Sequence, residues 1–338
     1  MSSSEQGADV PKFQVRYEPE SVADVPEEVF DCFLFPLDGP DPIEALDELV
    51  AGLPAALTPV ATAFSRNLES VVSVGTLPYQ MAAAAVAQRR FDRLWIAEQI
   101  RARKHMDEAG NIPDSAKSEA LATAKKRFEE EMQSRETADV MANHVLTTLS
   151  EGITRDATFH SACDELLRQA AVLTWGALEV LAKDLFAVWL NTTPMLAFSL
   201  LKDERTKKRY QLRSVPFETL ENLGFDLSAR MGDLLLGIHG VDDLPAMRDV
   251  FDVLCERDAE VRDALTSQDL WFLFQTRHVV VHGRGVVDQA YRDKTGDPRA
   301  VGTLLRVKPK ELDKYLRVVA RTGGRLLQAA ARAVPSAP

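Results

Sequence analysis

Apolar residues recur at helical spacing along most of the chain, and strand-like alternation is nearly absent. The strongest pattern lies in residues 160–191, where one apolar face predicts a buried helix. Its most apolar part, 171–190, contains three charged residues, so we interpret it as a core helix and not as a membrane span. The sequence therefore predicts an all-α protein. Further helices are expected at 42–74 in two pieces, 79–107, 115–150, 244–264, 268–282 and 309–333, with shorter helices in 194–235.

Turn-forming residues join two of these helices into a long hairpin. Gly110, Asn111 and Pro113 predict a turn between the helices at 79–107 and 115–150, which would then run antiparallel. Short strands are expected only at Val29–Phe35 and Thr303–Val307. We divide the chain into an acidic, mostly irregular arm (1–40), an N-terminal helical region with the long hairpin (41–152) and a C-terminal helical domain (153–335).

The charge of the chain is unevenly distributed. Its 338 residues carry a net charge of −11 and are 46% hydrophobic, enough for a substantial core. An acidic chain disfavours nucleic-acid binding by bulk charge alone. Residues 277–338, however, hold 13 Lys and Arg against 5 Asp and Glu, a net of +8, so the other 276 residues carry −19. Phosphate recognition is therefore expected only locally, near the C-terminus.

Cysteine usage and common motifs exclude several classes. Three scattered cysteines without a CxxC pair fit a reducing cytoplasm, and the first residues do not resemble a signal peptide. No Walker-type loop, HExxH or paired-cysteine zinc pattern is present, so we predict no cofactor and no metal. His160 and Cys163 have the spacing of a Cys–His pair, but capping or packing is the favoured interpretation.

Candidate chemistry gathers at the end of one predicted helix. Arg277, His278 and His282 follow an apolar run and precede a Gly-rich loop. Arg can hold a phosphate through two parallel hydrogen bonds, and a His with a near-neutral pKa can transfer a proton. Such a group could cleave RNA without metal: one residue deprotonates the ribose 2′-OH, another protonates the leaving oxygen, and Arg stabilises the charged phosphorane.

The Arg-x4-His spacing alone is not decisive. It is expected by chance roughly 0.5 times in this composition. It occurs twice, at Arg277–His282 and at Arg155–His160. The surrounding residues separate the two copies.

Residues 270–291 resemble the C-terminal signature of HEPN domains. That signature has an apolar helix, Arg, a polar residue, three apolar residues, His, and a Gly loop with an Asp and an aromatic residue. Residues 166–186 look like the earlier core helix of the family, with Glu179 at its acidic position. The resemblance covers about 155–335. The residues that match in order are Arg277, His278, Val279, Val280, Val281, His282, Gly283, Asp288 and Tyr291.

The resemblance implies a helical bundle that forms a homodimer and cleaves RNA without metal, in a toxin–antitoxin or phage-defence setting. Arg277 and His282 would be the catalytic pair, with His278 as the supporting polar residue. Glu179, Asp288 and Tyr291 would support the site, and we assign Arg284 to substrate binding. In one branch of the family a Tyr, modified by a partner nucleotidyltransferase, stands where this chain has Arg284. The expected partners are RNA, a second copy, and an antitoxin or defence-system protein, with no membrane.

Plainer interpretations remain open beside these. Arg277 and His278 could simply mark a helix C-terminus, where cations are favoured. His278 and His282 could form half of a metal site with Asp288. Glu179 could form an ordinary ion pair with a lysine four residues on, and the basic run Lys202–Arg213 could be a solvated loop. The competing function is a non-catalytic HEPN-like scaffold that dimerises or binds RNA.

Overall fold

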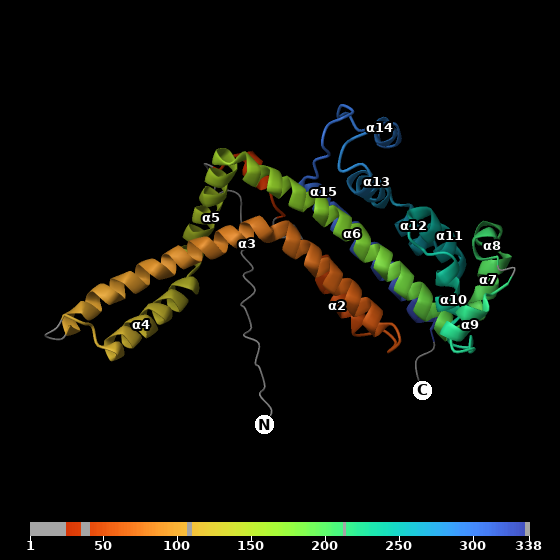
Figure 1. The fold of residues 1–338 in the computed structure, drawn as a ribbon, viewed down its shortest axis with the longest axis horizontal. Coiled ribbons are helices and arrows are strands. Elements are labelled where there is room, and N and C mark those ends of the chain that lie inside the picture. Colours follow the sequence, from red (N-terminus) through yellow and green to blue (C-terminus); the bar gives the residue numbers. More distant parts are fainter. Residues whose placement is uncertain (1–24, 35–40, 107–109, 212–213, 335–338) are drawn as a thin grey trace, which may run out of the picture. The chain divides into compact units, whose positions relative to one another are not determined.

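The computed structural model describes residues 25–34, 41–106, 110–211 and 214–334 (Figure 1). Within these ranges the protein is all-α, as predicted, and its β-type pairing is one isolated bridge between Val286 and Leu304. The predicted irregular arm falls largely on residues 1–24 and 35–40, which lie outside the described residues. The helices are α1 (Glu27–Phe30), α2 (Pro42–Val50), α3 (Thr58–Ala102), η2 (Arg103–His105), α4 (Asp114–Met132), α5 (Arg135–Arg155), α6 (Ala157–Thr192), α7 (Leu196–Lys202), α8 (Glu204–Tyr210), α9 (Phe217–Asn222), α10 (Met231–Ile238), α11 (Leu244–Leu254), α12 (Ala259–Thr266), α13 (Gln268–His282), α14 (Gln289–Thr295) and α15 (Pro309–Ala333).

The chain divides into two compact units, and α3 contributes to both. Unit 1 comprises Met1–Phe30 and Pro78–Ala157, and unit 2 comprises Asp31–Leu77 and Thr158–Pro338. Residues 41–77, which the sequence analysis grouped with the hairpin, therefore belong with the C-terminal helices. The reason is packing: α2 lies along α15, and the buried side chains of both helices join one hydrophobic core.

In unit 1 the second part of α3 and α4 form an antiparallel pair. Arg90 of α3 pairs with Glu131 at 2.8 Å, and Glu98, two turns further along α3, accepts a hydrogen bond from Arg127 at 2.7 Å. The partners run backwards along α4, as an antiparallel arrangement requires. These contacts confirm the predicted hairpin.

Two predicted helix boundaries in this region are wrong. The expected break before residue 79 is absent, because α3 continues through Pro78. A proline inside a helix removes one backbone hydrogen bond, but the Ala-rich segment that follows strongly favours helix. The single helix expected at 115–150 is instead two helices, α4 and α5, separated at Gln133 and Ser134.

One helical segment of the described residues, Thr58–His105, is long and apolar enough to cross a membrane by length and composition alone. A single such segment is a weak indication, because helices of globular proteins pass the same test. The most apolar stretch named in the sequence analysis, 171–190, lies in α6 and is largely buried.

Unit 2 is built around α6, which buries 15 of its residues and leaves a stripe that includes Leu173 and Val180 exposed. Its predicted apolar face is confirmed: Leu178, Leu181 and Leu185 are at most 1% exposed. The core also takes two tryptophans of α6, Trp175 and Trp189, again at most 1% exposed. Since a broad apolar face is stable only when other helices cover it, the buried side of α6 fixes the positions of the helices packed against it.

Other departures from prediction have local causes. The helix expected at 244–264 is interrupted because Glu256 and Arg257 adopt left-handed φ values of 51° and 63°. Asp258 then begins α12 by accepting a hydrogen bond from the backbone N–H of Glu260 at 2.8 Å. The two predicted strands are not formed: α1 replaces the first within its described part, and the second is reduced to the single bridge at Leu304.

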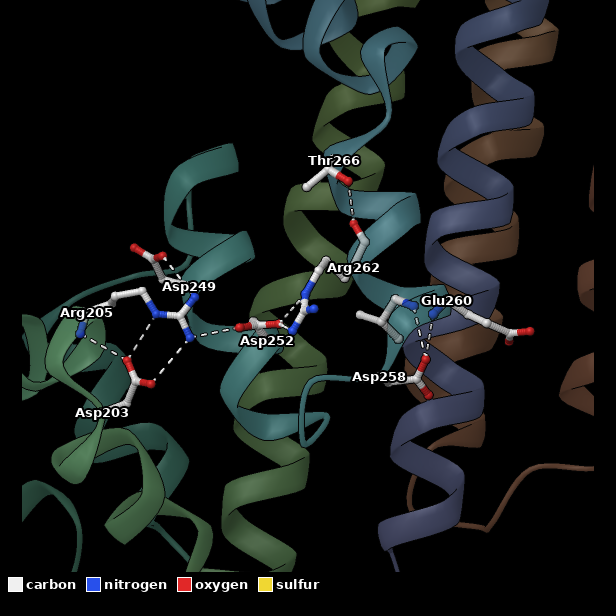
Figure 2. Close-up of polar contacts among 9 residues, drawn as sticks. Asp203, Arg205, Asp249, Asp252, Asp258, Glu260, Arg262 and Thr266 are labelled. Carbon is white, nitrogen blue, oxygen red and sulfur yellow. Dashed lines mark hydrogen bonds and ion pairs between the residues drawn. The ribbon is translucent and has the colours of Figure 1, made fainter.

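An ion-pair network joins three helices of unit 2 (Figure 2). The Asp252 carboxylate of α11 accepts hydrogen bonds from Arg205 of α8 and Arg262 of α12, each at 2.8 Å. Arg205 also pairs with Asp203, and its Nη1 lies 4.0 Å from Asp249. Every charge in this cluster has an opposite partner, so the network ties helices together and presents no vacant ligand set.

We expect stability to depend on pH through Asp252. Burial alone raises the pKa of Asp252, but the hydrogen bonds from Arg205 and Arg262 outweigh it and hold the pKa below its usual value. A carboxylate with a lowered folded-state pKa stabilises the protein above its unfolded pKa of about 3.9, and that stabilisation is lost as pH falls through the folded pKa. Asp252→Asn should therefore lower the unfolding free energy by about 1–2 kcal/mol at neutral pH. Urea melts between about pH 3 and 7 should show a shallower pH dependence for the variant; equal slopes would contradict this role.

The basic C-terminal segment is largely neutralised by acidic groups within the fold. Lys314 of α15 pairs with Asp269 of α13 at 2.6 Å, and Arg325 pairs with Glu260 of α12 at 2.9 Å. Phosphate recognition is therefore not a property of the whole segment. Further pairs of this kind are Arg299–Asp297, Arg306–Asp164, Lys308–Asp31, Arg317–Asp313 and Arg332–Asp258.

Candidate functional site

The candidate site lies at the C-terminal end of α13. The buried side chains of this helix include Leu273, Thr276 and Val280, which anchor it to the rest of unit 2. Arg277 is half-buried with 26% of its side chain exposed, while His278 and His282 are exposed. His282 is the last residue of the helix. The part of α13 that remains exposed therefore presents one guanidinium and two imidazoles to solvent.

Arg277 and His282, the predicted catalytic pair, are in direct contact. Arg277 Nη1 lies 3.2 Å from His282 Nε2. A guanidinium only donates hydrogen bonds, so in this contact His282 Nε2 is the acceptor, which places the ring proton on Nδ1. The nitrogen lone pair that would take a proton from a substrate is therefore covered by Arg277.

Glu179 reaches the site from α6. Its Oε2 lies 3.8 Å from Arg277 Nη2 and accepts a hydrogen bond from Trp175 Nε1 at 3.2 Å. Its Oε1 accepts one from Lys183 at 3.1 Å. Glu179 thus forms the ordinary ion pair with Lys183 that was one interpretation from the sequence, and it also lies beside the motif.

His278 stacks loosely beside His282, with ring centroids 4.8 Å apart and planes inclined by 50°. Burial lowers the pKa of His278, and the nearby His282, Lys294 and Arg277 lower it further, while Asp288 acts in the opposite direction. These effects favour the neutral form of the His278 ring, which supplies hydrogen-bonding capacity beside His282.

Asp288 and Tyr291 shape the loop that follows α13. Asp288 Oδ1 accepts a hydrogen bond from the Tyr291 backbone N–H at 2.7 Å and so caps α14. Tyr291 is 6% exposed and packs with Val279, Val287 and a few other buried residues, and burial raises its pKa. Both residues hold α14 against the end of α13. In the described part of the chain, no group of three His, Cys, Asp or Glu residues is placed to hold a metal ion.

Arg284 occupies an unusual backbone conformation. Gly283 follows the last residue of α13 and has an ordinary φ of −97°. The next two residues have left-handed backbone conformations, Arg284 with φ 53° and Gly285 with φ 74°. The Gly285 N–H bonds to the Val279 carbonyl at 3.0 Å, which holds the turn. Only glycine adopts this region readily, so an arginine there costs about 1–2 kcal/mol. The turn presents the exposed Arg284 side chain beside the motif.

The second Arg-x4-His copy has a different environment. Arg155 pairs with Glu151 at 3.3 Å. His160 Nε2 lies 2.9 Å from Arg306, whose Nε in turn donates to Asp164 at 2.9 Å. Each member of this copy thus has its own partner, and the arginine on His160 is neutralised by a close carboxylate. Arg277 differs because its nearest carboxylate is 3.8 Å away, which leaves its charge available to an anion.

Two site residues escaped the sequence analysis. Trp175 precedes Glu179 by four residues, so helical spacing could have indicated their contact. Asp242, which pairs with Lys183 at 2.9 Å, lies in the loop between α10 and α11, and no sequence pattern points to it.

Comparison of the chain with protein-family models, curated proteins and solved structures found no significant match.

Proposed function

We propose that unit 2 carries a HEPN-like, metal-independent endoribonuclease site, with Arg277 and His282 as the pair that acts on the phosphodiester. The observation that supports it is their 3.2 Å contact at the exposed end of α13. It joins a phosphate-binding group to a proton-transfer group in one place. Several other cations of the C-terminal segment, among them Lys314 and Arg325, are paired with carboxylates, which favours this cluster as the place where RNA binds.

In this mechanism the ribose 2′ oxygen attacks phosphorus and the bond to the 5′ oxygen breaks. Arg277 leaves His282 for the phosphate and stabilises the phosphorane charge. His282 Nε2, then uncovered, takes the 2′ proton, and a second acid protonates the leaving oxygen. The products are a 2′,3′-cyclic phosphate and a 5′-hydroxyl. A homodimer would supply the second acid from its other motif, while His278 orients His282 and Arg284 binds the adjacent phosphate.

The setting we propose is a reducing cytoplasm, the compartment that three scattered cysteines without a paired motif favour. An enzyme that cuts cellular RNA needs restraint. The proposal therefore includes an antitoxin or defence-system protein as partner.

RNA cleavage should survive EDTA and should require the 2′-OH. The proposed site moves protons between side chains and has no oxygen-rich ligand set of the kind that Mg²⁺ prefers. A ribo-oligonucleotide and its 2′-deoxy counterpart, incubated with and without EDTA, test this directly, with product ends identified by mass. Cleavage of the deoxy strand, or loss of activity on chelation, would favour a metal site at His278, His282 and Asp288 instead.

One observation favours the alternative, a non-catalytic RNA-binding or dimerising scaffold: Arg277 covers the lone pair of His282. A protein that binds RNA yet leaves it intact, with binding weakened by Arg277→Ala, would identify the scaffold.

A further inference from the structure

A line of polar contacts leads away from the candidate site along α6. Arg277 faces Glu179, Glu179 accepts a hydrogen bond from Lys183, and Lys183 reaches Asp242 in the loop between α10 and α11. The line therefore joins α13, α6 and the α10–α11 loop. Trp175 also packs against Phe274 of α13, with ring centroids 5.0 Å apart, which fixes the spacing of α6 and α13 beside the site.

Lys183 is held between two carboxylates. Its Nζ lies 2.9 Å from Asp242 Oδ1 and 3.1 Å from Glu179 Oε1. The hydrogen bond to Asp242, followed by that to Glu179, raises the pKa of Lys183 above its usual value. Its side chain is 38% exposed, so a salt bridge at this place contributes little to overall stability. A role in orienting Glu179 is the more specific consequence of this geometry.

Each carboxylate oxygen of Glu179 accepts a hydrogen bond from a different side chain of α6. Lys183 occupies Oε1, and Trp175 occupies Oε2 at 3.2 Å. Arg277 Nη2, at 3.8 Å from Oε2, lies beyond hydrogen-bonding distance. An unengaged carboxylate beside a guanidinium would form two parallel hydrogen bonds with it. Here it does not, and Arg277 bonds to His282 instead.

We propose that Lys183 is a positioning residue for Arg277. By occupying Glu179 Oε1, it keeps the Glu179 carboxylate from binding the guanidinium bidentately. The Arg277 guanidinium therefore stays hydrogen-bonded to His282 and is not neutralised by a bidentate ion pair with Glu179. It can then move to a substrate phosphate. The inference rests on the proposed function for its catalytic meaning, but the arrangement of side chains can be tested without any activity.

The test is the tautomer of His282, read by ¹⁵N NMR at about pH 8.5, where imidazole is neutral. In the wild-type protein we expect the proton on Nδ1, because Arg277 donates to Nε2. In Lys183→Met, Glu179 is free to capture Arg277, and Nε2 of His282 loses its donor. The Nε2–H tautomer should then predominate, as it does for imidazole side chains in water.

Two variants act as controls. Lys183→Arg keeps a cation on Glu179 and should retain the Nδ1–H tautomer. Lys207→Met removes an exposed lysine 3.6 Å from Glu204 on α8 and should leave the His282 signals unchanged. Thermal melts of all variants establish that each is folded before the spectra are compared.

The outcomes separate this inference from the proposed function. A tautomer change in Lys183→Met that is absent in the two controls supports the positioning role even if no RNA is cleaved. An unchanged tautomer in Lys183→Met overturns it, even if cleavage depends on His282. If cleavage is observed, the Lys183→Met variant should have a lower kcat with KM less affected. Arg277 would then be held by Glu179 and could not stabilise the charge of the transition state.

Discussion

His282→Ala is expected to lower the rate of RNA cleavage at least about 10²-fold, the usual scale for removing an acid–base group. Arg277→Ala should cost a similar factor, because the phosphorane charge then has no guanidinium beside it. His160→Ala is the matched control. Like His282, His160 accepts a hydrogen bond from an arginine, but that arginine is neutralised by Asp164. Its replacement should leave the rate nearly unchanged.

His278→Ala should give an intermediate loss, because His278 contacts the His282 ring and does not carry the essential proton. Initial rates on one ribo-oligonucleotide, for variants with matching melting temperatures, provide the comparison. Val279 and Val280 beside His278 are buried, so the melting control guards against a packing effect. Loss of cleavage in His160→Ala with retention in His282→Ala would sink the assignment of the site and the resemblance on which it rests.

Gly323→Ala in α15 should destabilise unit 2 markedly. A Cβ at this position would overlap the ring of Phe64 in α3 and lie 2.8 Å from Leu181 in α6. Phe64 and Leu181 are both 1% exposed, so neither can move without disturbing the core. Overpacking of this kind costs about 1–3 kcal/mol, which exceeds the gain of up to about 1 kcal/mol from replacing a helical glycine.

The neighbouring Gly324 supplies the control for that experiment. A Cβ there would meet Leu46 at 3.6 Å and Leu49 at 3.9 Å, which are ordinary contacts. Gly324→Ala should therefore stabilise the protein by up to about 1 kcal/mol through helix propensity. Urea unfolding should place the two midpoints on opposite sides of the wild-type value. Two variants of equal stability would show that the helices separate easily at this crossing.

Helical periodicity predicted the fold class because the apolar residues of unit 2 recur at helical spacing and face one shared core. The last helix was predicted at 309–333, matching α15, since Pro309 favours the first helical position and the apolar stripe continues without a break. Periodicity failed where local and tertiary effects compete. Separate helices were predicted on the two sides of residues 75–78, but α3 continues through Pro78 into the Ala-rich sequence after it. The two left-handed residues before Asp258 carry no strong turn signal.

The candidate site was predictable only in part. Arg277 and His282 are five residues apart near the end of one helix, so the spacing brings them to the same end of α13. Five residues correspond to about 140° around a regular helix, however, and do not by themselves predict the 3.2 Å contact. Glu179 belongs to another helix and was placed only through a family resemblance. The contact of Lys183 with Asp242 depends on how a loop packs against α6, which no spacing encodes. Long-range side-chain pairs of this kind need the structure.

The internal pairing of the C-terminal cations has a consequence for how RNA would be chosen. Counterion release, which drives most binding to nucleic acids, grows with the number of cations that meet phosphates. Here carboxylates of the fold already hold many of these cations, including Lys314 and Arg325. Affinity for a long strand would therefore be low and only weakly dependent on salt. The protein would then choose its substrate by the shape of the few nucleotides around the scissile bond. An exposed RNA loop would be distinguished in this way from other RNA.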